Sequence, residues 1–245
     1  MKPATSTPTF RPLYLQIKSM LEESLARREW GPGEVIPSEL ELASRYGVSH
    51  GTIRKAIAAL SADNLLVRRQ GRGTFVATHT EEHSSTFRFL RIRRNDQVDE
   101  YPASRLLELR RGKATGDVAR TLGLKPGEPV FGLRRVLDFD SRPTVLDDIT
   151  LPVALFRGLT RARFDAYRGS MYGFFETEFG VRMLRADERL RAVAADAGVA
   201  DILEVPVGEP LLTVDRVTFT FGDKPVEMRR AVCVTRRCHY LTSLN

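Results

Sequence analysis

The chain has 245 residues and a formal charge of +7, and its 42% of hydrophobic residues is a globular value that excludes a largely disordered protein. No apolar run approaches the roughly 20 residues that span a membrane, the first ten residues lack the apolar core of a secretory signal, and two cysteines exclude a disulfide scaffold. These features predict a cytoplasmic protein of one or two domains with no membrane partner, and the basic balance favours an anionic partner.

The N-terminal part of the chain predicts two helices after a flexible tail over residues 1–11. From Pro12, apolar residues recur at three- and four-residue steps and predict a helix that ends near Arg28. Ser38 with Glu41 three residues later forms a capping-box pattern, in which each side chain satisfies a backbone N–H at the start of a second helix.

A third helix and a hairpin follow a tight turn at Gly47. Ser49 is predicted to cap this helix, whose exposed side offers His50, Gly51, Thr52, Arg54 and Lys55. Two extended runs then predict a hairpin with Gly71 and Arg72 at its tip. A major groove about 12 Å wide admits one helix, so this order predicts a winged helix-turn-helix that binds double-stranded DNA. A basic face alone would fit an ordinary helical domain equally well.

The rest of the chain changes in character. Residues 78–87 are polar and unpatterned, and we predict a linker there. Strand patterns follow over residues 130–139, 145–151, 182–193, 211–221 and 226–234, and helical patterns over residues 116–122, 171–179 and 194–203. Because several of these strands are joined by short turns, residues 88–245 are predicted to form an antiparallel sheet with peripheral helices, an α+β domain.

Residues 12–77 resemble the DNA-binding domain of GntR-family repressors. The motifs that carry the resemblance are Pro12-Leu13-Tyr14, Pro37-Ser38-Glu39, Tyr46-Gly47-Val48-Ser49, Thr52-Ile53-Arg54 and Gln70-Gly71-Arg72-Gly73-Thr74-Phe75-Val76. Pattern and resemblance together give candidate DNA contacts at Ser38, Ser49, His50, Gly51, Thr52, Arg54, Lys55, Gly71 and Arg72. The family usually has arginine where this chain has Leu40 and His50. We therefore expect an operator that departs from the commonest family consensus at the bases read from these two positions.

Residues 88–245 resemble the effector domain (UTRA) of the HutC-like branch of this family, which shares the chorismate-lyase fold. The matching motifs include Pro126-Gly127-Glu128-Pro129-Val130, Ser170-Met171-Tyr172, Gly208-Glu209-Pro210-Leu211-Leu212 and Pro225-Val226-Glu227. The resemblance implies a metabolite pocket with contacts from Arg135, Asp147, Ser170, Tyr172 and Glu227. Four of these contacts have a plainer alternative: a solvated cross-strand ion pair for Arg135 with Asp147, a surface position for Glu227, and a core position for Tyr172.

Leu137 bears on the chemistry of the effector. Relatives that bind sugar phosphates carry a second arginine two residues after the first, at the position of Leu137. The loss of that cation favours a carboxylate or a neutral polar metabolite over a phosphosugar.

Together these features predict a ligand-responsive transcriptional repressor that binds operator DNA as a homodimer, with no enzymatic activity, cofactor or metal. Cys233 and Cys238 lack a second pair, and His79 and His83 lie in the predicted linker without further ligands. Two alternatives stay open: a lyase-like activity in the C-terminal domain, and a constitutive DNA-binding protein with a vestigial pocket. The sign of the effector's influence on DNA binding also stays open.

Overall fold

The computed structural model describes residues 11–79, 90–96 and 101–242. The chain forms two compact units, an N-terminal unit of residues 1–78 and a C-terminal unit of residues 79–245. Most of the predicted tail and of the predicted linker lies outside the described residues. Thr78 and His79, the two described residues of that linker, are both buried, so the chain at this point is not a solvated spacer.

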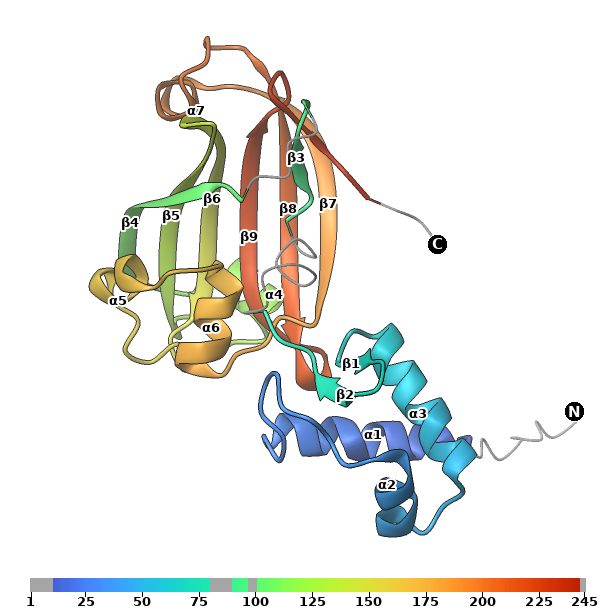
Figure 1. Cartoon of the computed structure of the whole chain (residues 1–245). Coiled ribbons are helices and arrows are strands. Elements are labelled where there is room, and N and C mark those ends of the chain that lie inside the picture. Colours follow the sequence, from blue (N-terminus) through green and yellow to red (C-terminus); the bar gives the residue numbers. More distant parts are fainter. Residues whose placement is uncertain (1–10, 80–89, 97–100, 243–245) are drawn as a thin grey trace, which may run out of the picture. The chain divides into compact units, whose positions relative to one another are not determined.

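The N-terminal unit contains three helices and a hairpin (Figure 1). Its elements are α1 (Leu13–Ala26), α2 (Glu39–Tyr46), α3 (His50–Ala62), β1 (Leu66–Arg69) and β2 (Gly73–Val76). Apolar faces of the helices form one core, which includes Ile17, Leu21, Leu42, Ile53, Ile57 and Leu60. Burial of these side chains is the main favourable contribution to the stability of the unit.

Local signals define the ends of α2 and the start of α3. The Ser38 hydroxyl accepts the Glu41 N–H at 3.3 Å, and the Glu41 carboxylate accepts the Ser38 N–H at 2.8 Å. Gly47 ends α2 in the left-handed conformation, with φ of 62°. The Ser49 hydroxyl accepts the Thr52 N–H at 3.2 Å. The predicted capping box, glycine stop and serine cap are all present.

We expect Gly47→Ala to lower the free energy of unfolding of the N-terminal unit by about 1–2 kcal/mol, because a side chain is disfavoured at positive φ. No atom lies within 4 Å of a Cβ placed there, so the cost comes from the backbone alone. Urea unfolding followed by the fluorescence of Trp30, the single tryptophan of the chain, measures it. The control Gly51→Ala lies in α3 without a positive φ and should leave the unit unchanged or slightly more stable. An equal loss in both variants would contradict the conformational argument.

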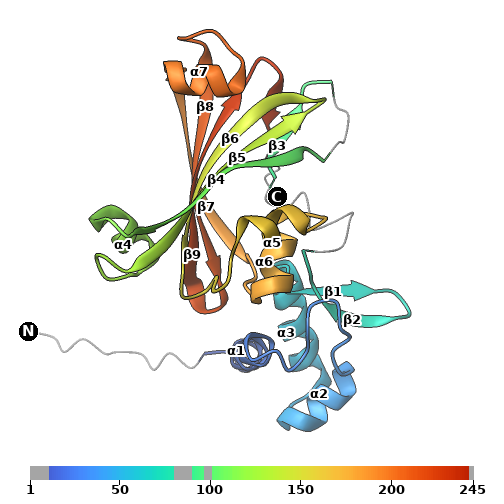
Figure 2. The ribbon, with the colours of Figure 1, turned by 90° about the vertical axis from the view of Figure 1, so that its left-hand side faces the viewer.

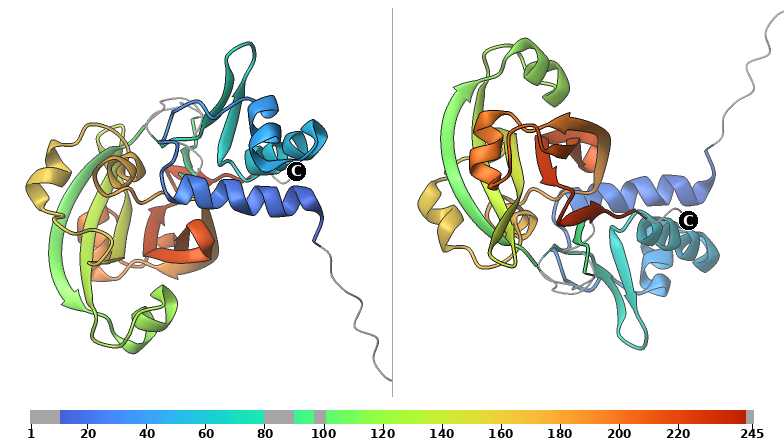
Figure 3. Two further views of the ribbon diagram at one scale, coloured as in Figure 1. Left: turned by 90° about the horizontal axis from the view of Figure 1, so that it is seen from below. Right: turned by 90° about the horizontal axis from the view of Figure 1, so that it is seen from above.

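The C-terminal unit contains a six-stranded antiparallel sheet of order β4-β5-β6-β9-β8-β7. Its strands are β4 (Ala103–Lys113), β5 (Pro129–Phe139), β6 (Arg142–Pro152), β7 (Arg185–Ala194), β8 (Pro210–Thr220) and β9 (Lys224–Val234). A second, two-stranded sheet pairs β3 (Ile92–Arg94) with β10 (Cys238–Tyr240). The large sheet is strongly curved (Figure 3). Strand β7 begins three residues later than predicted, because pairing with β8 starts at Arg185.

Helices cover both faces of this sheet. Among the described residues of this unit, the helices are α4 (Gly116–Leu122), α5 (Arg161–Ala166), α6 (Met171–Phe179) and α7 (Ala197–Leu203), and a 3₁₀ turn spans Phe221–Asp223. Helices α5 and α6 lie on the same side of the sheet as β3 (Figure 2), and α7 packs against the opposite face over Val136 and Leu146. Helix α7 starts at Ala197 rather than at residue 194, since β7 runs to Ala194 and Asp196 caps the helix by accepting the Val199 N–H.

Candidate functional site

The predicted DNA-contact residues share one property: each is at least partly exposed. They are Ser38, Ser49, His50, Gly51, Thr52, Arg54, Lys55, Gly71 and Arg72. Helix α3 buries Ile53 and Ile57 on its inner side, which turns Arg54 and Lys55 outward. Gly71 and Arg72 lie in the turn between β1 and β2.

Glu39, which the sequence did not single out as a contact, joins three basic side chains of this surface. Its carboxylate lies 2.9 Å from His50 Nε2, 3.3 Å from Arg54 Nε and 2.8 Å from a terminal nitrogen of Arg68. One carboxylate on α2 therefore joins two side chains of α3 and one of β1. The Ser-Glu motif at the start of α2 was the available signal for this role.

A row of charged side chains crosses one face of the large sheet. On β5, Leu133, Arg135 and Leu137 are alternate residues and so face the same way. Leu133 belongs to the apolar cluster under α6, and Leu137 to the cluster under β3. Arg135 thus lies between two apolar clusters. It is paired in register with Asp147 of β6.

Strands β7 and β8 extend this row. Arg216 of β8 is in register with Glu188 of β7 and donates to its carboxylate at 2.6 Å. Arg216 is also in register with Arg229 of β9. The row therefore contains cations and carboxylates from five strands, and most of its members are buried.

Hydrogen bonds hold Arg135 and Arg229 around Asp147. Arg135 Nε lies 2.9 Å from Asp147 Oδ2, and Arg229 Nη1 lies 3.4 Å from the same oxygen. Burial raises the pKa of Asp147, but the two guanidinium groups outweigh it and hold that pKa below its usual value. Asp147 is 1% exposed, so an ionised carboxylate is held in the interior by its partners.

Tyr172, from the first turn of α6, joins this network. Its hydroxyl donates to Glu227 at 2.9 Å and lies 3.3 Å from Arg216 and 3.4 Å from Arg229. Burial is the main cause that raises the pKa of Tyr172, and the phenol is therefore protonated near neutral pH. Arg229 Nε donates to Glu227 at 2.9 Å.

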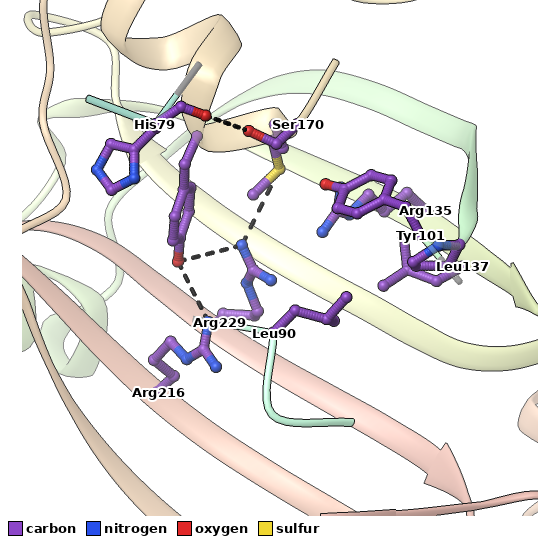
Figure 4. Close-up of a pocket in the computed structure, with 11 residues that line it drawn as sticks. His79, Leu90, Tyr101, Arg135, Leu137, Ser170, Arg216 and Arg229 are labelled. Carbon is purple, nitrogen blue, oxygen red and sulfur yellow. Dashed lines mark hydrogen bonds between the residues drawn. The ribbon is translucent and has the colours of Figure 1, made fainter. Parts of the chain in front are cut away.

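A cavity lies above the charged row, with about 440 Å³ of space free of protein atoms, open solvent included (Figure 4). Its wall is formed by His79, Leu90, Tyr101, Pro102, Arg135, Leu137, Ser170, Met171, Tyr172, Arg216 and Arg229. The wall thus combines three guanidinium groups with hydroxyl groups and apolar side chains.

The predicted effector contacts divide into two groups. Arg135, Ser170 and Tyr172 line the cavity. Asp147 lines an adjoining cavity instead, and Glu227 is 0% exposed and holds Tyr172 and Arg229 from behind. The alternatives of a solvated ion pair for Arg135 with Asp147 and of a surface position for Glu227 are wrong, because all three residues are buried.

Sequence reasoning missed Arg216, Arg229, Tyr101 and His79 in the cavity wall. One signal was available for Arg229: it follows Glu227 by two residues on a strand and therefore shares its face. His79 falls in the predicted linker, and the structure shows it buried, with 6% exposure.

Comparison with known proteins identifies the two units. A family model described as bacterial regulatory proteins, gntR family, matches residues 13–76, and the UTRA domain model matches residues 97–239, more than half of the chain. The chain belongs to the GntR family. The UTRA domain places this regulator in the HutC-like branch and confirms the predicted α+β fold class.

Relatives of this GntR-family regulator are themselves regulators. It is 33% identical to the HTH-type transcriptional regulator Rv0792c of Mycobacterium tuberculosis, over 89% of this chain and 80% of the relative. It is 28% identical to the histidine utilization repressor of Pseudomonas putida, over 90% and 87% of the two chains. The crystal structure of the ligand-binding domain of a GntR-family regulator from Bordetella bronchiseptica is 48% identical, with a TM-score of 0.62, and covers 64% of this chain and 98% of that domain.

The regulator thus belongs to a class of DNA-binding transcriptional repressors and is not an enzyme, which removes the lyase alternative. In the described part of the chain, no helix has the length and apolar character to cross a membrane. The described residues also contain no group of three or more histidine, cysteine or acidic side chains arranged for a metal ion. His83 lies outside the described residues.

Both thiols of the regulator are expected to be unreactive in the native state. Cys233 and Cys238 are 0% and 2% exposed. Burial raises the pKa of Cys238 to about 12 and that of Cys233 well above its usual value. Since the thiolate is the reactive form, labelling with a disulfide reagent at pH 8 should be at least ~100-fold slower for the native chain than in denaturant. Release of one thiol equivalent within seconds from the native chain would contradict this expectation.

Proposed function

We propose that this GntR-family regulator is a homodimeric repressor whose UTRA cavity binds a small carboxylate or neutral polar metabolite and thereby changes operator binding. The observation that carries the proposal is the cavity wall, where Arg135, Arg216 and Arg229 accompany the hydroxyl groups of Ser170 and Tyr101. Guanidinium groups form two parallel hydrogen bonds with a carboxylate, and hydroxyl groups fix its orientation.

The charge balance of the row supports a ligand of low charge. Arg135, Arg216 and Arg229 each have a carboxylate partner among Asp147, Glu188 and Glu227, so three positive charges face three negative charges. A phosphosugar would bring about two further negative charges at neutral pH. Leu137 stands in the wall where a further cation would be needed. A carboxylate or a neutral polar ligand fits this balance better.

The proposed mechanism couples two sites. Two recognition helices, one from each protomer, would read half-sites about 34 Å apart on one face of the DNA. We expect the dimer to have two arrangements, only one of which fits the operator. A ligand that binds one arrangement more tightly than the other changes the free energy of operator binding, typically by about 1–3 kcal/mol.

A thermal-shift screen of the full chain tests the ligand. The library contains small carboxylic acids, amino acids, neutral sugars and sugar phosphates. A ligand at 100 times its dissociation constant should add about 2.7 kcal/mol of stability, and the same compound should alter an electrophoretic shift of operator DNA. Arg135→Gln should abolish the shift in melting temperature, and the exposed control Arg189→Gln on β7 should retain it.

Two results would overturn the proposal in different ways. If only sugar phosphates stabilised the chain, the argument from charge balance against a phosphosugar would be wrong, but the protein would still be a ligand-responsive repressor. A folded chain with no hit from any class would favour a constitutive repressor with a vestigial pocket.

A further inference from the structure

His79 is the first residue of the C-terminal unit, and hydrogen bonds to other described residues of that unit hold it there. Its N–H donates to Glu176 Oε2 at 2.8 Å, and its carbonyl oxygen accepts the Ser170 hydroxyl at 3.3 Å. Its ring nitrogen Nε2 lies 2.9 Å from the carbonyl oxygen of Met183. Two of these bonds involve the main chain of His79, so they fix the path of the chain as well as the side chain.

The residues that hold His79 also belong to the cavity. Ser170, which caps α6, lines the cavity together with His79 and Tyr172, and Figure 4 shows the bond between Ser170 and His79 at its wall. The His79 ring stands edge-on to Tyr172, with centroids 5.8 Å apart. A ligand in this cavity would therefore contact His79, which we call the anchor, and the Ser170 side chain that holds it.

The connection from this anchor to the DNA-binding unit is short. Strand β2 ends at Val76, and the Ala77 N–H donates to the carbonyl oxygen of Leu65 at 3.0 Å within the N-terminal unit. His79 follows Val76 by three residues, and three extended residues span at most ~11 Å. The connection therefore keeps His79 close to the end of β2, so His79 is the point of the C-terminal unit where a displacement reaches the DNA-binding unit by the shortest path along the chain.

The Ser170 hydroxyl has a single proton to donate. Its oxygen accepts the Gly173 N–H at 2.9 Å, which caps α6, and its proton is directed to the His79 carbonyl oxygen. An anionic or carbonyl oxygen of a ligand at Ser170 would accept the same proton. Ligand and His79 carbonyl are therefore competitors for one donor.

We propose that His79 is the positioning residue that couples the effector cavity to the DNA-binding unit, with the Ser170 hydroxyl as the switch. This inference rests on the proposed ligand response. An occupied cavity takes the Ser170 proton, the hydrogen bond from Ser170 to the His79 carbonyl oxygen is broken, and the short connection carries the change to β2. Because coupling between two sites is reciprocal, DNA binding must in turn alter the anchor.

The reciprocal direction allows a test without the effector. The probe is a DNA duplex selected from a random pool by the full chain, and the readout is amide hydrogen exchange of the full chain with and without it. In the wild type, the duplex should change the exchange rates of peptides covering residues 76–79 and 170–176 at least threefold, besides those of α3. No change at residues 170–176, with a clear change at α3, would overturn the coupling.

Ser170→Ala removes the donor and should abolish the duplex-induced change at residues 171–176 while that at α3 persists. The matched control is Thr160→Ala. It likewise removes a cap hydroxyl, which accepts the Arg163 N–H at the start of α5. The control should respond like the wild type. A purely structural role of Ser170 would shift the exchange rates of α6 with and without DNA alike, and an unaltered duplex-induced difference would overturn the proposal.

A second variant addresses the connection itself. Insertion of two glycines between Ala77 and Thr78 should abolish the duplex-induced change at residues 170–176, whereas the same insertion between Asp140 and Ser141, in the β5–β6 turn, should not. Full transmission through the lengthened connection would overturn the proposal. A thermal-shift screen without hits would refute the proposed effector but leave these results standing, because the duplex is the only probe.

Discussion

Replacement of Arg54 by alanine is expected to weaken operator binding by about 1–3 kcal/mol, or roughly 5- to 150-fold, and to relax sequence specificity. Arg54 projects from the first turns of α3, the part of a recognition helix that reaches base edges, and its side chain is 62% exposed. Glu39 holds the Arg54 Nε at 3.3 Å and leaves the terminal nitrogens of the guanidinium group to a base. Fluorescence anisotropy with operator and random duplexes at one fixed salt concentration measures both effects.

The control for charge alone is Arg189→Ala. Arg189 is an exposed arginine of β7 in the C-terminal unit, and its loss changes the net charge equally. We expect it to leave the ratio of operator to random binding unchanged. If Arg54→Ala weakened random and operator DNA by the same factor, Arg54 would be a phosphate contact and its base-reading role would be wrong.

Asp147→Asn is expected to destabilise the C-terminal unit by about 3–5 kcal/mol, because removal of one buried partner leaves cations without compensation. Asp147 is 1% exposed and lies 2.8 Å from Arg135 and 3.4 Å from Arg229. Asparagine keeps the shape but not the charge, so the loss reports the electrostatic contribution. Urea unfolding followed by far-UV circular dichroism measures this loss, and the fluorescence of Trp30 follows the N-terminal unit separately.

The neighbouring residue supplies a matched control. Asp148, on the opposite face of β6, pairs with Arg134 at 2.7 Å, but both side chains are more than 40% exposed. Asp148→Asn should therefore cost only about 0–1 kcal/mol. Similar losses in the two variants would show that burial does not govern the effect.

The pH dependence provides a second check on Asp147. Its folded-state pKa lies below the usual value, so its contribution to stability is present above the unfolded-state pKa of about 3.9 and is lost as the pH falls through the folded-state pKa. The stability difference between wild type and Asp147→Asn should accordingly be constant near neutral pH and shrink below about pH 4. A difference that grew on acidification would contradict the depressed pKa.

Much of the DNA-binding unit could be predicted from the sequence because its signals are local. The capping box of Ser38 with Glu41, the glycine stop at Gly47 and the cap at Ser49 act over three or four residues within one helix turn. Helices α4 and α6 have the predicted bounds for the same reason. Helix α5 was not predicted, since it buries no side chain and shows no apolar periodicity.

The cavity of the C-terminal unit was only partly predictable. Arg135, Ser170 and Tyr172 were found through motifs, but the roles of Asp147 and Glu227 behind the wall depend on which face of the sheet is covered. Short strands such as β3 and β10 pair across more than 140 residues and leave no local pattern.

The sequence by itself therefore determined the two units, the class of each and the third helix of the N-terminal unit, because hydrophobic periodicity and helix caps are short-range properties. Only the tertiary structure decided the charged row and the position of His79. The row brings together Arg135, Arg216 and Arg229 through the register of strands that are distant in sequence, and His79 reaches Ser170 and Glu176 across more than 90 residues. The register of the strands and the contact of His79 with a distant helix both depend on how the whole unit packs. No short stretch of sequence carries that information.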